Sequence, residues 1–349
     1  MKDILFNLDR PYHARIGRGA VNGLAAAANT FTGKRAVVIT DDGVPTEHVS
    51  KCASLLEASG KTPLVCVLKS GERNKNLGSV RSVYSFLYEN GVTRSDGVIG
   101  VGGGIVLDTA GFAAATYMRG LPFISVPTTI IAQTDSAYGG KTGVDFLDGK
   151  NHIGVFSHPR EVLCDTDFLR TLPEAERVCG MGEVVKYVAI ALPHMSETLS
   201  RDLPSDELIA GCVDVKRRYV EADEFDTGER HVLNFGHTFG HAFEAASGFS
   251  IPHGQAVAYG MLAVSALGER LGITDGSVLP AIRQACIACG LETDFAPLAP
   301  SALPLLVRDK KADGKGLELV LLEKLGKPVR LKLSAEDVFS HMRSLVSTE

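Results

Sequence analysis

The sequence predicts an α/β protein of two domains, a parallel-sheet domain over residues 1–171 and a mainly helical domain over residues 172–349. A chain of 349 residues is long for a single hydrophobic core, so two domains are the default expectation. Short apolar runs alternate with helical segments in the first half, whereas helical segments dominate the second half. Because strand–helix alternation is typical of a parallel sheet with helices on both faces, the change of pattern marks the expected boundary.

The strands of the first domain are predicted from apolar runs. They lie at Arg35–Thr40, Pro63–Leu68, Gly97–Val101, Phe123–Pro127 and Val162–Asp165. Helical segments such as Val49–Ser59 and Leu77–Asn90 separate several of these runs. We therefore expect consecutive parallel strands in one sheet.

The second domain is predicted from helical periodicity. Its helices are expected at Pro173–Leu192, Asp206–Glu224, Thr238–Ser247, His253–Leu271 and Gly276–Cys289. A hairpin is expected from Leu317–Leu322 and Val329–Leu333, and a closing helix over Ala335–Val346. The boundary falls near Asp167–Leu172, and a cleft between two such domains is a usual place for an active site.

Composition excludes several classes of protein. A hydrophobic content of 45% and a charged content of 22% are ordinary for a globular protein, and a net charge of −5 argues against a nucleic-acid surface. Met1–Arg10 has acidic residues where a secretory leader has an apolar core, and the uncharged stretch near His253–Gly268 is too short and polar to span a bilayer. Seven scattered cysteines suit a reducing compartment, and the lone CxxC of Cys286 and Cys289 predicts helix packing. We expect a cytoplasmic protein without membrane or nucleic-acid partners.

The densest group of potential metal ligands lies in the second domain. His237 and His241 are spaced i,i+4 in a predicted helix and point to one side, and His253 opens the next helix. Upstream, Glu183 and Lys186 add a carboxylate and an amine at i,i+3. Imidazoles serve as metal ligands or acid–base groups. Hydrogen-bonded structural histidines are the alternative, but no packing reason explains two histidines at this spacing between glycines.

A glycine turn in the first domain predicts a nucleotide site. Gly97–Asp108 is a strand that runs into a glycine turn and then a helix, whose free N–H groups favour a phosphate. It is not a strict GxGxxG, because the last position is Ile105 counted from Gly100 and Leu107 counted from Gly102. A Rossmann-like nucleotide site is expected, with a tight turn without ligand as the alternative.

Polar residues follow other predicted strands. Asp41 and Asp42 could reach ribose hydroxyls, with surface aspartates as the equal alternative, and Thr128 and Thr129 end a strand where open sheets bind ligands. A glycine-rich segment with two lysines, from Asp135 to Asn151, predicts a binding loop or merely a flexible one. Several cations, each alone more typical of a solvated surface, could together hold a polyanionic substrate. These are Arg119, Lys141, Lys216, Arg230, Lys310 and Lys311.

Eight segments, taken in order, match a known family. They are Gly102–Gly120, Val126–Thr129, Asp135–Gly143, Gly149–Gly154, Asp165–Pro173, Gly182–Tyr187, Asn234–His241 and His253-Gly254. Over nearly its whole length the chain resembles 3-dehydroquinate synthase, of the sugar-phosphate cyclase group. The motifs are long and spaced as in that family, so chance agreement is negligible.

The resemblance implies an NAD- and metal-dependent carbon–oxygen lyase that uses zinc or cobalt. Family enzymes convert 3-deoxy-D-arabino-heptulosonate 7-phosphate, a phosphorylated sugar acid, to 3-dehydroquinate and phosphate in the shikimate pathway. The implied sequence is oxidation by NAD, β-elimination of phosphate, re-reduction and intramolecular aldol closure, so NAD is a transient electron store.

The resemblance also implies roles for individual residues. Glu183, His237 and His253 match the metal ligands, which leaves open positions for two substrate hydroxyls. Asp135 and Lys186 match residues near those hydroxyls. Lys216 and Arg230 match residues that bind the substrate carboxylate. The residues that match contacts to the substrate phosphate are Lys141, Asn151, Asn234, His241 and one of Lys310 and Lys311.

The implied NAD shell is larger. It comprises Asp41, at the adenosine ribose, with Glu72, Lys75, Gly104, Ile105, Val106, Leu107, Asp108, Thr128, Thr129, Lys141, Lys150, Phe168, Leu169, Arg170 and Thr171. Arg119 matches an arginine that reaches the substrate phosphate from a neighbouring subunit, so a homodimer is expected.

Three residues depart from the family pattern. Leu107 stands where glycine is usual and would either crowd the pyrophosphate or pack the helix start. Asp145 replaces, or sits beside, a usual asparagine, and Gln255 replaces a common glutamate. Gln255 would remove one negative charge near the metal.

Three other functions remain open at this point. A related cyclase making 2-deoxy-scyllo-inosose, amino-dehydroquinate or a valiolone is one, although Asn234 and Arg230 argue against the inosose type. A metal-dependent polyol dehydrogenase would need neither Lys216 nor Arg230. A non-catalytic binder of nucleotide or metal is supported only by Leu107 and Gln255.

Overall fold

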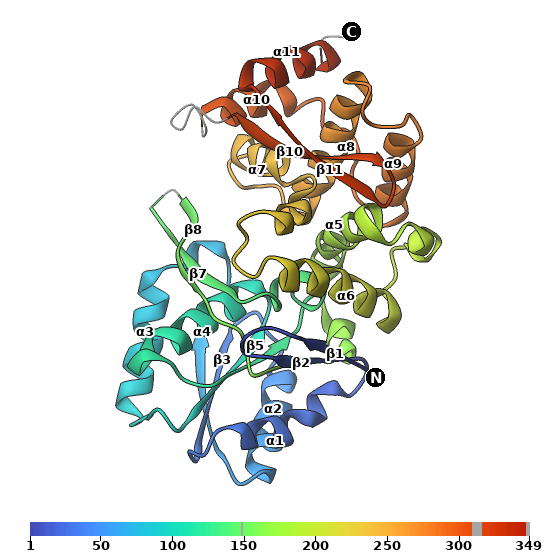
Figure 1. Cartoon of the computed structure of the whole chain (residues 1–349). Coiled ribbons are helices and arrows are strands. Elements are labelled where there is room, and N and C mark those ends of the chain that lie inside the picture. The colour runs from blue at the N-terminus through green and yellow to red at the C-terminus, as the bar shows by residue number, and fades with distance from the viewer. Residues whose placement is uncertain (148, 309–315, 347–349) are drawn as a thin grey trace. The chain divides into compact units, whose positions relative to one another are not determined.

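The computed structural model describes residues 1–147, 149–308 and 316–346 (Figure 1). The chain packs as two compact units. The first unit contains Met1–Pro173 and Ser205–Phe225, and the second contains Glu174–Pro204 and Asp226–Glu349. The expected single boundary at residue 171/172 thus lies close to Pro173, where the chain first passes into the second unit. The chain then returns to the first unit for Ser205–Phe225.

The first unit is built on a seven-stranded sheet in the order β1-β2-β9-β6-β5-β3-β4. The strands are β1 (Lys2–Phe6), β2 (Tyr12–Ile16), β3 (Arg35–Asp41), β4 (Thr62–Leu68), β5 (Gly97–Gly102), β6 (Phe123–Pro127) and β9 (Glu161–Cys164). All neighbours pair in parallel except β1 and β2, which form an antiparallel hairpin. The predicted parallel strands are confirmed. The N-terminal hairpin was not predicted, because its strands are short and mix polar with apolar residues.

Helices cover both faces of this sheet. They are α1 (Leu24–Ala27), α2 (Thr46–Ala58), α3 (Leu77–Glu89) and α4 (Gly104–Thr116). One face buries Leu24, Leu56 and Ile99, and the other buries Val83, Leu87 and Phe123. Helix α4 is apolar nearly all round because it packs both on the sheet and on a separate hairpin, β7 (Lys141–Phe146) and β8 (Gly149–Phe156).

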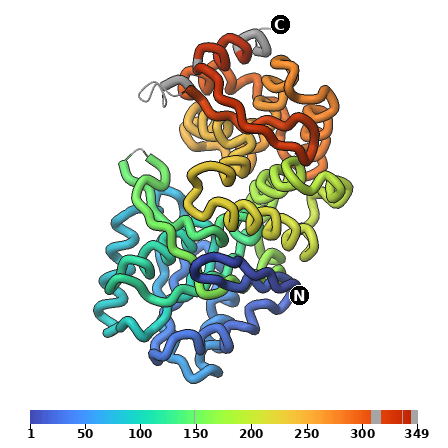
Figure 2. The backbone as a smooth tube through the Cα atoms, in the orientation of Figure 1, coloured from blue at the N-terminus to red at the C-terminus, as the bar shows by residue number. Residues whose placement is uncertain are grey.

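Helix α6 (Asp206–Ala222) belongs to the first unit despite its late position in the chain. It contacts β1, β2 and the π-helix Ala132–Ser136, which lie far from it in sequence. Figure 2 shows α6 beside the dark-blue N-terminal hairpin. The helix was predicted correctly, but periodicity does not state which core will bury its apolar residues.

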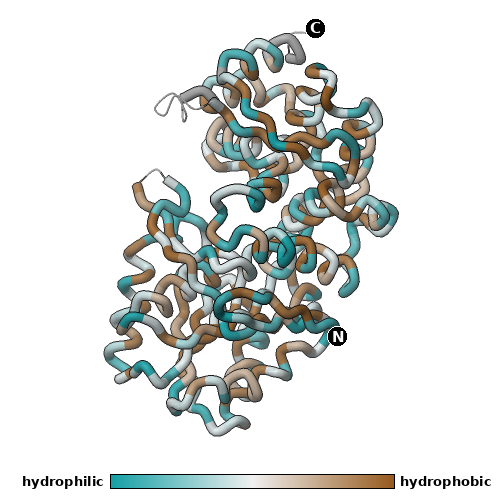
Figure 3. Tube along the Cα trace, in the orientation of Figure 1, coloured by the Kyte–Doolittle hydropathy of each residue, from teal (hydrophilic) through white to brown (hydrophobic). Residues whose placement is uncertain are grey.

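The second unit is mainly helical, as predicted. Its elements are α5 (Glu174–Ala191), α7 (His237–Ala246), α8 (His253–Arg270), α9 (Val278–Ala288), α10 (Ala299–Arg308), the hairpin β10 (Leu317–Lys324) and β11 (Lys327–Leu333), and α11 (Ala335–Val346). Polar and apolar residues alternate along β11, as expected for a strand with one covered face (Figure 3). Helix α10 was not predicted. None of the described helices is long and apolar enough to cross a bilayer.

Glycines set how closely α5, α7 and α8 approach. A Cβ at Gly254 would lie 1.7 Å from the carbonyl oxygen of Cys179, and a Cβ at Gly182 would lie 2.2 Å from that of Gly254. A Cβ at Gly260 would lie 1.9 Å from the carbonyl oxygen of Gly236. Any side chain at these positions would force the helices apart.

Candidate active site

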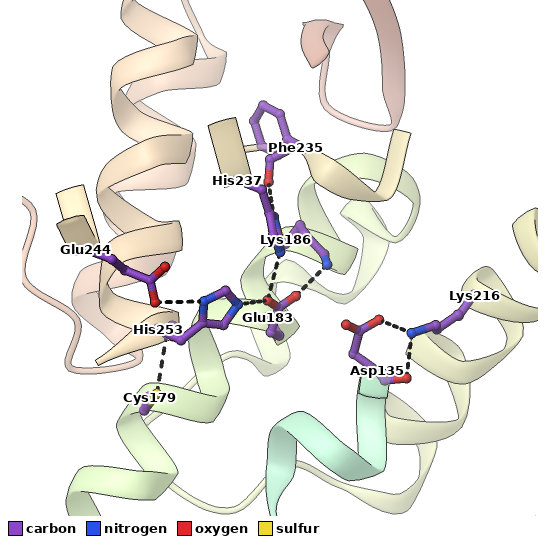
Figure 4. Close-up of polar contacts among 10 residues, drawn as sticks. Asp135, Cys179, Glu183, Lys186, Lys216, Phe235, His237, Glu244 and His253 are labelled. Carbon is purple, nitrogen blue, oxygen red and sulfur yellow. Dashed lines mark hydrogen bonds and ion pairs between the residues drawn. The ribbon is translucent and has the colours of Figure 1, made fainter. Parts of the chain in front are cut away.

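A buried carboxylate and two imidazoles meet in the second unit. Glu183 Oε1 lies 3.1 Å from His253 Nε2 and 3.4 Å from His237 Nε2 (Figure 4). One ligand atom from each of these residues falls within 4.8 Å of the other two. The three side chains therefore fit a single divalent cation with mixed nitrogen and oxygen ligands.

Helix packing brings these residues together. Glu183 follows Gly182 on α5, and His253 precedes Gly254 at the start of α8. Because neither glycine has a side chain, the two backbones touch at this point, and the ligands on either side lie within reach of one ion.

Both imidazoles are oriented through their other nitrogen. His237 Nδ1 lies 3.3 Å from the carbonyl oxygen of Phe235, and His253 Nδ1 lies 3.2 Å from Glu244 Oε1. When Nδ1 donates these hydrogen bonds, Nε2 is the nitrogen that can bind a metal once any proton it carries is displaced. This is the pattern in which metal-bound histidines are usually held.

Charge in this cluster also suits a cation. Burial raises the pKa of Glu183, but Lys186, 2.5 Å away, and the two imidazoles outweigh it and hold that pKa well below its usual range. Burial lowers the pKa of His253, yet its hydrogen bonds to Glu183 and Glu244 raise it to about 9. Without a metal His253 carries a proton, which a bound cation would displace.

Glu244 is a residue that the sequence reasoning missed. It is 3% exposed, and with His241 and His253 it forms a second possible set of metal ligands. The signal was present, because His237, His241 and Glu244 recur at i, i+4 and i+7 on α7. His253 belongs to both sets, presenting Nε2 to Glu183 and Nδ1 to Glu244.

In the first unit, Asp135 and Lys216 form an ion pair. Lys216 Nζ donates to the Asp135 carbonyl oxygen and to its Oδ1, each at 2.6 Å (Figure 4). Asp135 lies in the π-helix Ala132–Ser136, a rare geometry that is frequent at functional sites. Lys216 comes from α6, so the return of the chain to the first unit is what forms this pair.

Several residues of the expected NAD shell also meet. Lys75 Nζ donates to Asp108 Oδ2 at 2.6 Å and to Asn151 Oδ1 at 2.5 Å. Asp108 lies in the first turns of α4, after the glycine turn. A Cβ at Gly104 would lie 3.0 Å from Ser136 Oγ, so a side chain at this helix start would have to displace that hydroxyl. The free N–H groups of a helix start suit a pyrophosphate.

A second missed residue supports the 3₁₀ helix Thr166–Thr171, which holds the expected NAD contacts Phe168, Leu169, Arg170 and Thr171. His48 Nε2 lies 2.7 Å from Thr171 Oγ1, and its ring stacks on Phe168 with centroids 4.1 Å apart. Burial lowers the pKa of His48, so the ring is neutral near pH 7. Because His48 lies far from Thr171 in the sequence, no local sequence pattern indicated this contact.

The other expected residues lie on several elements. Asp41 ends β3, and Thr128 and Thr129 follow β6. Glu72 lies in a 3₁₀ turn, Lys141 begins β7, and Lys150 lies on β8. The residues expected to contact the carboxylate or phosphate from other elements are Arg119 in the turn Tyr117–Arg119, Arg230 and Asn234 in the 3₁₀ helix Glu229–Asn234, and His241 on α7. Lys310 and Lys311 lie outside the described residues.

Two departures from the family pattern have a packing explanation. Leu107 is 3% exposed, and a Cβ at Gly100 would lie 3.1 Å from its Cδ2, so Leu107 packs on β5. Gln255 pairs with the backbone of Glu292, donating from Nε2 to the carbonyl oxygen and accepting from the amide at Oε1, each at 2.9 Å. A glutamate could not make the donated bond.

The CxxC cysteines are structural, as predicted. Cys286 and Cys289 are both buried, and burial raises the pKa of each thiol to about 12. Thiols that stay protonated are poor nucleophiles and poor metal ligands.

Comparison with known proteins identifies the family. Residues 65–179 match the N-terminal model of 3-dehydroquinate synthase, and residues 180–312 match its C-terminal model. The 3-dehydroquinate synthase of Streptococcus sanguinis (strain SK36) is 42% identical over 327 residues, which cover 90% of this chain and 92% of that protein. The chain belongs to the 3-dehydroquinate synthase family.

Other relatives agree. The 3-dehydroquinate synthase of Streptococcus suis (strain 05ZYH33) is 40% identical over 344 residues, covering 95% of this chain and 97% of that protein. A 2-deoxy-scyllo-inosose synthase, solved with carbaglucose-6-phosphate, NAD+ and Co2+, superposes with a TM-score of 0.88 at 26% identity, covering 98% and 99% of the two chains. The expected α/β fold is thereby confirmed. Because identity to 3-dehydroquinate synthases is much higher, the comparisons favour that activity over the inosose rival.

Proposed function

We propose that this chain converts 3-deoxy-D-arabino-heptulosonate 7-phosphate to 3-dehydroquinate and phosphate, with NAD and one divalent metal, zinc or cobalt. The observation that carries the proposal is the cluster of the buried Glu183 with the half-buried His237 and His253 in a member of the 3-dehydroquinate synthase family. When bound, the metal would polarise a secondary alcohol of the substrate, and NAD would accept and later return a hydride.

In this proposal Glu183, His237 and His253 hold the metal. Lys186 keeps Glu183 ionised and is itself 1% exposed, so its ammonium is held in place by the carboxylate. Near the reacting hydroxyls, a buried cation of this kind would stabilise an alkoxide as its proton leaves.

Asp135 and Lys216 act on the substrate from the first unit. As a carboxylate, Asp135 can also accept a hydrogen bond from a substrate hydroxyl. Lys216 and Arg230 are proposed as the two cations that bind the substrate carboxylate.

Donors and cations bind the phosphate until it leaves. They are proposed to be Lys141, Asn151, Asn234, His241, and Lys311 or Lys310. Arg119 is proposed to reach the same phosphate from a partner subunit, so we propose a homodimer. All seven cysteines are free thiols, which supports the proposed cytoplasmic location.

The NAD shell is proposed to hold the cofactor at the glycine turn. Gly104–Asp108 supply the start of α4, and Asp41, at the end of β3, is proposed to bind a ribose hydroxyl. Phe168–Thr171, supported by His48, are also proposed to contact the dinucleotide.

Phosphate release and net NADH test the proposal together. Purified protein with metal, NAD and the heptulosonate phosphate is expected to release one phosphate per substrate without net NADH. A polyol dehydrogenase would accumulate NADH, and a binding protein would do neither. Failure to release phosphate in the presence of metal and NAD would refute the proposal.

A further inference from the structure

Asp145 closes a ring of three hydrogen bonds in the first unit. Its backbone N–H donates to the carbonyl oxygen of Lys75 at 2.9 Å. Its Oδ1 accepts from the backbone N–H of Asn151 at 2.7 Å. Lys75 Nζ then donates to Asn151 Oδ1 at 2.5 Å, which completes the ring. The ring joins residues of the expected NAD shell to a residue expected at the substrate phosphate.

Asp145 stands where the β7–β8 ladder is interrupted. The strands pair Val144 with Ile153 and then Phe146 with Gly149, with a bulge between them. Asn151 lies opposite this bulge and has a left-handed φ of 54°. The regular ladder therefore offers its N–H no acceptor, and the Asp145 carboxylate takes that place. Asparagine tolerates this conformation better than most residues, but it still needs local hydrogen bonds to hold it.

Lys75 fixes the polarity of the Asn151 amide. Its ammonium only donates, so the atom that faces it must be the amide oxygen. The amide NH2 group is then presented to other acceptors, and phosphate oxygens accept only. Burial lowers the pKa of Lys75, but Asp108 outweighs burial and the pKa is raised, so the ammonium stays charged.

We propose that Asp145 is a positioning residue that holds Asn151 as a donor to the substrate phosphate. This inference rests on the proposed function, because Asn151 is assigned to the phosphate there. Asp145 does not touch the substrate. It fixes the backbone of Asn151 while Lys75, anchored by Asp108, fixes the side chain.

The test compares Asp145→Ala with Asp145→Asn. An alanine has no acceptor, whereas an asparagine keeps an oxygen for the Asn151 N–H and loses only the charge. Binding of the heptulosonate phosphate is measured by calorimetry on protein loaded with metal and NADH, which cannot begin the reaction because its first step needs NAD. We expect Asp145→Ala to weaken binding about tenfold and Asp145→Asn to stay within twofold of the parent.

Three further measurements separate positioning from general damage. The dephosphorylated heptulosonate should bind both variants as it binds the parent, because the missing group is the one that Asn151 contacts. In an Asn151→Ala background, Asp145→Ala should add less than twofold. Leu147→Ala, a matched change at an 87% exposed hairpin residue, should leave binding unchanged.

The outcomes that overturn the inference are distinct from failure of the proposed function. The inference is refuted if Asp145→Ala binds the heptulosonate phosphate as tightly as the parent does. It is also refuted if Asp145→Asn weakens that binding as much as Asp145→Ala does, or if Asp145→Ala weakens binding of the dephosphorylated heptulosonate equally. The inference is refuted too if Asp145→Ala weakens binding in the Asn151→Ala background as much as it does in the parent. It is likewise refuted if Leu147→Ala weakens binding as much as Asp145→Ala does. A parent protein that binds the heptulosonate phosphate but releases no phosphate with NAD would instead refute the proposed function.

Discussion

The two overlapping sets of potential metal ligands make opposite predictions for His237 and His241. Both sets contain His253, but only one contains Glu183 and His237, and only the other contains His241 and Glu244. We expect His237→Ala to lose stoichiometric metal and His241→Ala to keep it. The reason is that Glu183 Oε1 lies within 3.4 Å of two Nε2 atoms, so one ion can bind all three groups.

The same geometry gives the size of the effect at Glu244. Its carboxylate accepts from His253 Nδ1 at 3.2 Å and is 3% exposed, so it orients a ligand without being one. Removing such an outer partner typically costs 10–100-fold in metal affinity, or about 1.4–2.8 kcal/mol. Glu244→Ala should therefore bind one metal with a lower affinity. Glu244→Gln, which keeps an acceptor oxygen, should lose less.

Metal content after gel filtration and affinity by competition with a chromophoric chelator measure both quantities. His231→Ala, in the same unit but outside both sets, is the matched control, and circular dichroism checks that each variant is folded. If His241→Ala or Glu244→Ala abolished metal binding while His237→Ala retained it, the metal would belong to the other set. The assignment of Glu183 would then be wrong.

The remaining predictions concern stability, the substrate carboxylate and the subunit arrangement. Gln255→Glu should lower the free energy of unfolding by about 1 kcal/mol, because a carboxylate cannot donate to the Glu292 carbonyl; an unchanged melting temperature would contradict this. Arg230→Ala should weaken transition-state binding by roughly 2–5 kcal/mol for the natural substrate and much less for an analogue without the carboxylate, whereas equal losses would indicate a structural role. Mixing inactive Arg119→Ala and His241→Ala proteins under subunit exchange should restore about a quarter of parental activity, since about half the dimers would be mixed with one intact site each. Mixed dimers without activity would show that Arg119 serves its own subunit.

Much of the fold is determined locally and was predicted from the sequence. Apolar runs such as Gly97–Val101 and Phe123–Pro127 become central parallel strands because both faces of such strands are buried. The spacing of His237 and His241, followed by His253 at the next helix start, also predicted where potential metal ligands gather. These patterns report what each element buries or presents along its own length.

Tertiary structure decided which elements meet and which partners orient the functional side chains. The sequence alone did not assign α6 to the first unit, where Lys216 reaches Asp135. Nor did it indicate that Glu244 orients His253 or that Asp145 holds Asn151. For each of these contacts, the local sequence around one residue does not reveal that the other residue will be its partner. These contacts form because the tertiary structure fixes the distances between the side chains. Close helix packing at glycines, the β7–β8 bulge and a shared core set those distances, and local periodicity does not encode them.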